Sequence, residues 1–346
     1  MASGSSSGPF INSHQLITKT AMKSMYSLLC RVAGVALIAM AFSAAAQAET
    51  TPIRIGYGVA AEEQLWLMMA KPDVSPNQGK TYSIEAMRFP GADKRVQAFE
   101  AGALDIATMS ANGAIFAAAE GIKFKIIASL SRESERGFYT KFMVKDDSPI
   151  KTIADLKGKT IGLNGLSGSG HLWTRMILQK AGIAESDVTL VPISFSAQDE
   201  ALRAGKIDVA MFPQPFAQMS ESRGGVRTLY TSKDGAPFEE ELMVLIAKDE
   251  FLAKNSALVR SFLSDLVGAT QYYNKNPQEA RKAIIEQKMV RVAPDVYLPM
   301  TDYFREPSAH IDLSALEKMQ DAQVKYGFQT KRADLNSVVD MKYLPQ

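Results

Sequence analysis

The chain has 346 residues, of which 22% are charged, and a formal net charge of +2 at pH 7. Residues 1–48 hold three of the 39 Lys and Arg residues and none of the 37 Asp and Glu residues, so the remainder is formally −1. A near-neutral chain argues against nucleic acid or an anionic membrane as its main partner. About 298 residues follow position 48, which is enough for two lobes with their own cores.

The first 48 residues have the pattern of an export signal. Lys23 and Arg31 precede an apolar run, 32–46, that is too short to span a bilayer. Ala46-Gln47-Ala48 then gives the small-x-small pattern that signal peptidase cleaves. We therefore expect 1–48 to be a signal peptide with an upstream extension, and the mature protein to be periplasmic. A single membrane anchor is the alternative.

Cys30 is the only cysteine and lies within this expected signal. An exported chain without cysteine suits a bacterial periplasm and uses no disulfide framework. A thiol nucleophile, a thiolate metal site and an iron–sulfur cluster are therefore excluded for the mature chain.

Beyond residue 50, short apolar strands alternate with amphipathic helices, which favours an α/β fold with right-handed crossovers and a mainly parallel sheet. In the first unit we expect strands at 52–57, 83–89, 106–109 and 123–130, and helices at 63–70, 93–101 and 110–119. After residue 249 the pattern turns helical, and these helices should pack back on the first unit. They are expected at 257–274, 277–286, 294–304 and 313–326.

The chain repeats one pattern twice. In 96–110 and in 199–212, a helix ends at a glycine, two residues follow, and an aspartate introduces a short buried strand. The two aspartates, Asp105 and Asp208, are 103 residues apart, and earlier landmarks keep nearly the same offset. A duplicated βαβα unit predicts two similar lobes with a cleft between them.

Extended runs at 139–144 and 241–247 flank the second repeat, so both are candidate crossing strands. Two crossings would form a hinge and make the first lobe discontinuous in sequence. We therefore expect lobe one to contain 49–144 and 242–346, and lobe two to contain 145–241.

Five stretches carry a family resemblance: Ile53–Tyr57, Phe89–Gly91, Ala98–Asp105, Asp155–Lys159 and Ala201–Asp208. Together they resemble the periplasmic solute-binding proteins of ABC importers, in the nitrate/sulfonate/taurine and thiamine-pyrimidine-precursor group. The resemblance covers roughly residues 52–247. It implies the type II periplasmic-binding-protein fold, with two α/β lobes that close on a small solute, and an inner-membrane ABC permease as partner.

The strongest local signal is the glycine-rich loop 165–171, between an expected strand and an expected helix. Its glycines let a ligand approach the backbone, and a helix N-terminus favours a negative charge. The alternative is a tight turn with a capping serine. The loop lacks the Gly-Lys-Ser/Thr of a nucleotide P-loop. The candidate ligand-binding residues in it are Ser167, Gly168, Ser169 and His171.

Other candidates follow strands, because ligands of open α/β sheets bind at the carboxyl ends of the strands. For each of them, helix capping or core packing is the alternative. Arg132, before the first crossing, is a candidate for bidentate pairing with a carboxylate or sulfonate, although a solvated hinge loop with internal ion pairs explains it equally well. The remaining candidates are Gly58, Gln64, Phe89, Ser110, Asn112, Gln214 and Phe216.

Catalysis finds little support in the mature sequence. Its two histidines, His171 and His310, are far apart and have no metal-ligand partner at helical spacing. We therefore expect a monomeric binding protein without cofactor or metal, which captures a small organic anion and delivers it to the permease. The anion would be a sulfonate or carboxylate, with room for an aromatic group. The alternative is an enzyme on the same fold that acts on a pyrimidine or a related small molecule.

Overall fold

A computed structural model describes residues 1, 3–5, 50–166 and 168–346. Most of the expected signal peptide, its cleavage site, Cys30 and Ser167 lie outside the described residues. Thr50–Gln346 forms one unit, separate from Met1–Glu49, and the following description concerns this unit. Among the described residues, no helix is long and apolar enough to cross a membrane.

The first of two five-stranded sheets within the described residues has the order β2-β1-β3-β10-β4. Strand β1 runs parallel to β2 and β3, whereas β10 runs antiparallel to β3 and β4. Most residues of the central strands are apolar and buried, because helices cover both faces of the sheet. Its strands are β1 (Thr51–Tyr57), β2 (Tyr82–Arg88), β3 (Ile106–Ser110), β4 (Lys125–Glu133) and β10 (Glu240–Ala247).

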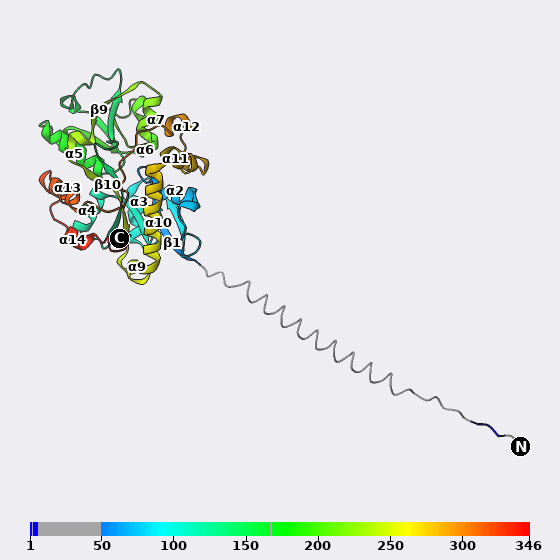
Figure 1. The fold of residues 1–346 in the computed structure, drawn as a ribbon. Coiled ribbons are helices and arrows are strands. Elements are labelled where there is room, and N and C mark those ends of the chain that lie inside the picture. Colours follow the sequence, from blue (N-terminus) through cyan, green and yellow to red (C-terminus); the bar gives the residue numbers. More distant parts are fainter. Residues whose placement is uncertain (2, 6–49, 167) are drawn as a thin grey trace. The chain divides into compact units, whose positions relative to one another are not determined.

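The second sheet repeats this plan in the order β7-β6-β8-β5-β9. Strand β6 runs parallel to β7 and β8, and β5 runs antiparallel to β8 and β9, so β5 occupies the position that β10 has in the first sheet. The two-lobed α/β fold expected from the sequence is thereby confirmed (Figure 1). The strands are β5 (Lys141–Lys145), β6 (Thr160–Leu163), β7 (Thr189–Pro192), β8 (Val209–Phe212) and β9 (Val226–Thr231).

The repeated aspartates accept the same kind of hydrogen bond in both sheets. Asp105 Oδ2 accepts a hydrogen bond from the backbone N–H of Arg54 at 3.0 Å, and Asp208 Oδ2 accepts one from the N–H of Thr160 at 2.8 Å. Each carboxylate therefore satisfies a backbone donor at the start of the neighbouring parallel strand. This is the physical reason for an aspartate before each buried strand.

The repeated glycines have a matching explanation. A Cβ on Gly56 would lie 2.4 Å from Leu104 Cδ1, and one on Gly162 would lie 2.7 Å from Ile207 Cδ1. In each repeat the apolar residue that precedes the aspartate packs against the first strand, so only glycine leaves enough space there.

The chain passes between the sheets twice, through 134–140 and through 232–239, which includes the short helix α8 (Ser232–Gly235). The expected crossing strand at 139–144 corresponds to β5, which pairs only within the second sheet. The expected boundary is therefore corrected: 141–144 lie with the second lobe rather than with the first. The backbone hydrogen bonds of β5 to β8 and β9 fix this placement.

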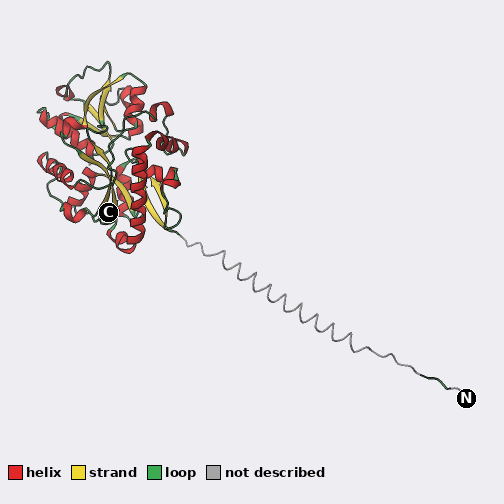
Figure 2. Ribbon diagram, viewed as in Figure 1, coloured by secondary structure: helices red, strands yellow, loops and turns green. Residues whose placement is uncertain are grey.

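Helices cover both sheets (Figure 2). Those that follow strands of the first sheet are α2 (Glu63–Ala70), α3 (Ala92–Glu100) and α4 (Ala111–Ala119), and those of the second are α5 (Ser169–Lys180), α6 (Phe195–Arg203) and α7 (Phe216–Ser222). One-turn 3-10 helices lie at Pro72–Val74, Ile153–Leu156 and Glu185–Asp187. The C-terminal helices are α9 (Asp249–Lys254), α10 (Ser256–Lys275), α11 (Pro277–Glu286), α12 (Pro294–Tyr297), α13 (Leu313–Lys325) and α14 (Leu335–Val338).

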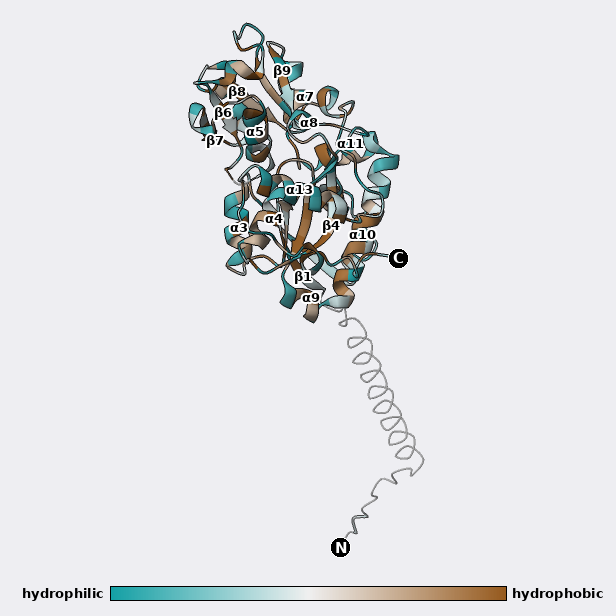
Figure 3. Cartoon of the chain, turned by 90° about the vertical axis from the view of Figure 1, so that its left-hand side faces the viewer, coloured by the Kyte–Doolittle hydropathy of each residue, from teal (hydrophilic) through white to brown (hydrophobic). Residues whose placement is uncertain are grey.

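The C-terminal helices pack mainly on the first lobe. Helices α10 and α11 contact α2, and α13 contacts α4 and β10. Apolar residues concentrate in the strands and on the helix faces turned toward them (Figure 3). In the second lobe the core includes a stacked pair, Phe142 and Tyr230, whose ring centroids are 4.3 Å apart.

The helix expected at 294–304 is wrong beyond Tyr297, because α12 ends there. The following backbone is held by Arg281, whose Nη1 donates to the carbonyl oxygens of Leu298 and Met300 at 2.7 and 2.8 Å. These carbonyls are thus satisfied by a side chain instead of by a continued helix.

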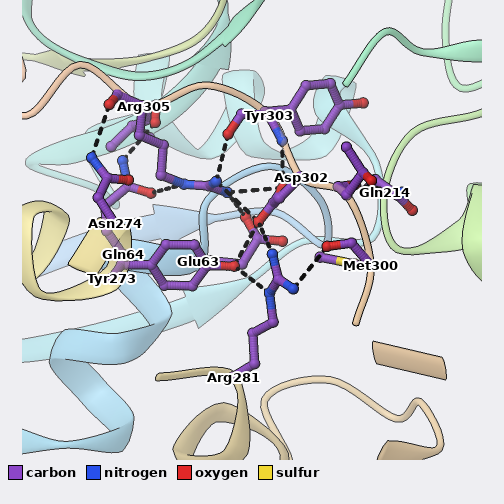
Figure 4. A network of polar contacts seen from close by, with 12 residues as sticks. Glu63, Gln64, Gln214, Tyr273, Asn274, Arg281, Met300, Asp302, Tyr303 and Arg305 are labelled. Atoms are coloured by element: carbon purple, nitrogen blue, oxygen red, sulfur yellow. Dashed lines mark hydrogen bonds and ion pairs between the residues drawn. The ribbon is translucent and has the colours of Figure 1, made fainter. Parts of the chain in front are cut away.

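A buried ionic network then fixes the rest of this segment (Figure 4). Arg305 is ion-paired with Glu63 on α2 and with Asp302, whose Oδ2 lies 3.0 Å from Arg305 Nη1. Tyr273 on α10 donates to the same carboxylate at 2.5 Å. Although burial opposes it, Arg305 and Arg281 hold the pKa of Asp302 below its ordinary value. The network joins α2, α10 and α11 to the C-terminal segment.

Candidate functional site

A cleft of about 460 Å³ lies between the two sheets. Its wall is built by residues that come directly after parallel strands of both sheets, which is where open α/β sheets hold ligands. The lining residues after these strands are Gly58 after β1, Phe89 after β2, Asn164 after β6 and Pro213 after β8, and Ser110 ends β3. Both lobes therefore contribute to one cavity.

Several of the described helices begin at this cleft. Helices α3, α4 and α5 start beside Gly91, Ser110 and Gly168, and all three residues line the cavity. Ser110 Oγ caps α4 by accepting from the N–H of Gly113 at 3.2 Å, whereas the glycine N-caps of α3 and α5 provide no side-chain cap. The first N–H groups of a helix lack intrahelical acceptors and carry the positive end of its dipole. The starts of these helices therefore favour a negative charge, whereas the carboxyl groups of Glu62, Asp93 and Glu120 in the same lining oppose one.

Arg95, on α3, supplies a full positive charge at the same place. It is 6% exposed, and its Nη1 lies 3.8 Å from Glu62 Oε1. Its Nε is buried and has no hydrogen-bond partner among the described residues. Burial lowers the pKa of Arg95, against the opposing effect of Glu62, but an arginine remains protonated at neutral pH. Arg95 thus retains donors for a further acceptor.

Glu62 is held by other groups besides Arg95. It accepts hydrogen bonds from the N–H of Gly58 at 2.8 Å and from Thr108 Oγ1 at 2.7 Å. Burial raises the pKa of Glu62, and Arg95 opposes this rise. A Cβ on Gly58 would lie 2.5 Å from Arg95 Nη1 and 2.7 Å from Glu62 Oε1. Gly58 is therefore needed for the close approach of this pair to the backbone.

Asn164 faces the cleft from the second lobe. Its Oδ1 is buried and has no hydrogen-bond partner among the described residues. An unpartnered buried amide costs free energy unless a ligand or water satisfies it. Sequence reasoning missed both Arg95 and Asn164. One signal could have found Asn164: it lies directly after β6, in a position equivalent to that of the residues after β1.

The structure brings some of the predicted site residues together at the cleft and places others elsewhere. Those that line it are Gly58, Phe89, Ser110, Gly168 and Ser169. Phe216 lines an adjoining second cavity. Those outside both linings are Gln64, Asn112, Arg132, His171 and Gln214.

Asn112 is used to hold the lobes together instead of lining the cleft. Its Nδ2 donates to Ser169 Oγ on α5 at 3.1 Å and to Glu240 Oε1 on β10 at 3.3 Å. Its Oδ1 accepts from Gln323 Nε2 on α13 at 2.8 Å. The side-chain donor and the side-chain acceptor of Asn112 therefore both have hydrogen-bond partners within the protein.

Arg132 forms internal ion pairs, but it is buried on β4 and not in the solvated loop that the alternative expected. Its Nε lies 2.9 Å from Glu241 Oε1, and its Nη2 donates to the carbonyl oxygen of His310 at 2.7 Å. The guanidinium also lies over the ring of Phe304. These contacts hold Arg132 within the first lobe.

Gln64, Gln214 and His171 are also engaged in structural contacts. Gln64 donates to the carbonyl oxygen of Leu130 at 2.6 Å and accepts from Arg305. Gln214 donates to the carbonyl oxygen of Thr301 at 2.7 Å, which links the second lobe to the C-terminal segment. The ring nitrogens of His171 lie 2.5 Å from the carbonyl oxygen of Leu166 and 3.2 Å from Glu185 Oε1. These contacts orient the glycine-rich loop.

No cluster of His, Cys, Asp or Glu side chains among the described residues has the arrangement of a metal site. The cleft offers a guanidinium and helix N-termini as donors and the Asn164 Oδ1 as an acceptor, in a largely apolar wall.

Known proteins are similar to this chain in sequence. A family model described as NMT1/THI5 like matches residues 84–280, which is more than half of the chain. A protein of Escherichia coli (strain K12) named as an aliphatic sulfonates-binding protein is 25% identical over 254 residues, covering 73% of this chain and 76% of that protein.

Solved structures show the same fold. The alkanesulfonate-binding protein SsuA from Xanthomonas axonopodis pv. citri, bound to MOPS, has a TM-score of 0.69 and 19% identity, covering 85% of this chain and 99% of that chain. The desulfurization enzyme DSZB has a TM-score of 0.61 and 14% identity, covering 85% and 97%. At these identities the likeness concerns the fold, which both a binding protein and an enzyme share.

Proposed function

This chain belongs to the NMT1/THI5-like family, and we propose that it is an exported substrate-binding protein for a small organic anion. It captures a sulfonate or carboxylate in the cleft and delivers it to an ABC permease. The observation that supports this most is Arg95, buried in the cleft with an Nε that has no partner among the described residues. The names of the sulfonate-binding relatives agree with it.

The oxygens of an acidic group would accept hydrogen bonds from Arg95 and from N–H groups at the starts of α3 and α5. Each charge-assisted bond contributes about 1.5–3 kcal/mol. Asn164 reaches the same cavity from the second lobe. Because donors come from both lobes, an anion held between them stabilises the closed arrangement.

The two passages of the chain between the sheets give the lobes a hinge. Closure about such a hinge buries the solute, and a permease distinguishes the closed form from the open one. We propose a periplasmic location, since the family resemblance and the expected signal peptide both indicate export, and the monomer stays a prediction.

A ligand screen tests the proposal. Aliphatic sulfonates, aromatic sulfonates, aromatic carboxylates and nitrate would each be added to the protein in a thermal unfolding assay, because a ligand of the folded state raises the melting temperature. We expect organic anions to raise it and neutral analogues of the same shape to leave it unchanged. A melting temperature unmoved by every anion would contradict the proposal.

Two substitutions in the buried pair should act in opposite directions. Arg95→Gln removes the guanidinium and should weaken anion binding by about tenfold or more. Glu62→Gln keeps the size of the side chain and removes the neighbouring negative charge, so it should retain or raise the affinity. Equal loss of affinity in both variants would show that the pair is structural rather than anion-binding.

An enzyme is the second candidate, because DSZB shares the fold. It would require the bound molecule to be converted. The composition of the solute after incubation distinguishes the two functions.

A further inference from the structure

A second cavity of about 550 Å³ adjoins the cleft. Val59, Pro90 and Phe195 line both cavities, so the two are neighbouring compartments of one interlobe space. The first compartment contains Arg95 and the helix N-termini, and the second extends toward α7 and the segment before α12. Helices α7 and α12 are in contact and lie side by side in Figure 1.

The second lobe gives the second compartment an aromatic wall. The rings of Phe195 and Phe216 are 5.6 Å apart, centroid to centroid, with an interplanar angle of 34°. Both side chains are half-buried. Phe195 reaches the first compartment as well, so the wall is continuous from the anion-binding region into the second compartment.

The first lobe contributes two arginines to the same compartment. Arg88 ends β2, and Arg291 lies between α11 and α12. Within the described part of the chain neither guanidinium has an ion-pair partner, whereas Arg223, from the second lobe, is paired with Asp199 and Glu200. The unbalanced positive charge of the second compartment therefore belongs to Arg88 and Arg291.

The size of the first compartment also argues against a bare inorganic ion. Its volume is about 460 Å³, which is far more than one water molecule needs. A four-atom oxyanion would leave most of that space to solvent. Cavities of about 300–1,000 Å³ hold organic ligands that are largely buried.

From these observations we infer that the solute is an elongated aromatic acid with a second acidic group. One acidic group lies near Arg95, the aromatic body lies along Phe195 and Phe216, and the second acidic group faces Arg88 and Arg291. The inference rests on the proposed function and names the solute class for that site.

Matched probes test the inference by isothermal titration calorimetry on the full chain. The probes are ethanesulfonate, benzenesulfonate, biphenylsulfonate, para-benzenedisulfonate and a biphenyl disulfonate with one sulfonate on each ring. Biphenylsulfonate should bind at least about tenfold more tightly than ethanesulfonate, because it buries apolar surface on the aromatic wall. One of the two disulfonates should bind about tenfold more tightly again than its monosulfonate.

Variants test which residues produce each gain in affinity. Phe195→Ala and Phe216→Ala should reduce the preference for biphenylsulfonate over ethanesulfonate, and Phe251→Ala, a half-buried phenylalanine on α9, should not. The double variant Arg88→Gln/Arg291→Gln should remove the preference for the disulfonate, measured as the ratio of the disulfonate affinity to the monosulfonate affinity of the same variant. Arg260→Gln, an exposed arginine on α10, is its control.

The outcomes separate this inference from the proposed function. If ethanesulfonate and the aromatic probes bound equally well, or if neither disulfonate exceeded its monosulfonate, the inference would be overturned while anion binding stood. If neither these probes nor any anion of the thermal unfolding screen bound to the parent protein, both would be overturned.

Discussion

Trp173 Nε1 on α5 donates a 2.6 Å hydrogen bond to Glu240 Oε2 on β10, which ties a helix of the second lobe to a strand of the first. Glu240 is buried at the second crossing, and burial raises its pKa to about 8 even though Trp173 and Asn112 donate to it. Glu133, at the first crossing, is also buried, and its pKa is raised to about 7. Both crossings therefore contain a carboxyl group that burial keeps protonated in the neutral range.

Stability should fall as the pH rises through the neutral range. The folded-state pKa of Glu240 is above the ordinary value of 4.5, so the folded protein holds a proton that the unfolded chain releases. The stabilisation from this proton is complete below pH about 4.5 and is lost as the pH rises through about 8. The free energy of unfolding should fall by about 1.4 kcal/mol per pH unit for each such group. Denaturant titrations at several pH values between about 5 and 8 measure this slope.

Glu240→Gln should make the slope shallower, because a glutamine remains neutral at every pH and still accepts from Trp173. Glu100→Gln, at the exposed end of α3, is the matched control and should leave the slope unchanged. A Glu240→Gln protein with the parent's pH dependence would refute the assignment to Glu240.

Asn112 should prove to be a stability residue. Asn112→Ala removes the donor to Ser169 and Glu240 and the acceptor for Gln323. Leaving buried partners unsatisfied costs about 1–3 kcal/mol each, so the free energy of unfolding should drop by at least that amount. Asn255→Ala is the control, because Asn255 bonds only to the carbonyl oxygen of Phe251, four residues earlier. Equal losses in the two variants would contradict a role for Asn112 at the lobe contact.

Arg305 should be one of the most sensitive positions in the C-terminal region. Arg305→Met leaves Glu63 as a buried carboxylate without its ion-pair partner and leaves Asp302 with Arg281 alone, which costs about 3–5 kcal/mol. Arg332 is a matched control, since it also pairs with two carboxylates, Glu317 and Asp321, but at an exposed site. Arg332→Met should cost less than about 1 kcal/mol. Chemical denaturation of both variants measures the difference, and similar losses would disprove the importance of burial.

The local pattern of the sequence was enough to predict much of the fold. The helix Glu63–Ala70 has the predicted bounds, because its apolar spacing is confined between polar residues and the lysine that ends it. Asp105 and Asp208 were recognised as equivalent because their contacts lie within one repeat. The placement of β5 was not predictable, since its partners β8 and β9 come more than 60 residues later in the chain.

The site was less predictable than the fold, for the same physical reason. The sequence pattern around Arg95 is that of a surface helix. Its ion-pair neighbour Glu62 belongs to another segment of the repeat. Asn112 follows a strand, as a ligand-binding residue would, but Gln323 from 211 residues away fills its acceptor. Contacts between residues that are far apart in the sequence decide which of several similar polar residues remain available to a ligand.

Gly168 should be required for binding and not for folding. It has ordinary backbone angles, and a Cβ there would meet only Ser110 Oγ, at 3.8 Å. Gly168→Val should therefore unfold close to the parent temperature while its side chain occupies the approach to the start of α5. Loss of one charge-assisted bond, about 1.5–3 kcal/mol, would weaken anion binding by about 10- to 150-fold. A variant that binds the organic anion as well as the parent would exclude this loop from the site.

A binding protein should return its solute unchanged, whereas an enzyme on this fold would not. Arg95 and the helix N-termini in the cleft lining bind an acidic group through hydrogen bonds and charge, without forming a covalent bond to it. Mass spectrometry after long incubation should recover the solute intact, and added metal should not alter the affinity. Closure of the lobes about the two crossings should also reduce the radius of gyration in small-angle scattering when the solute is added. Conversion of the bound molecule would exclude a role in transport alone. In that case Glu62, buried beside Arg95 with a raised pKa, would be the first residue to test as an acid–base group.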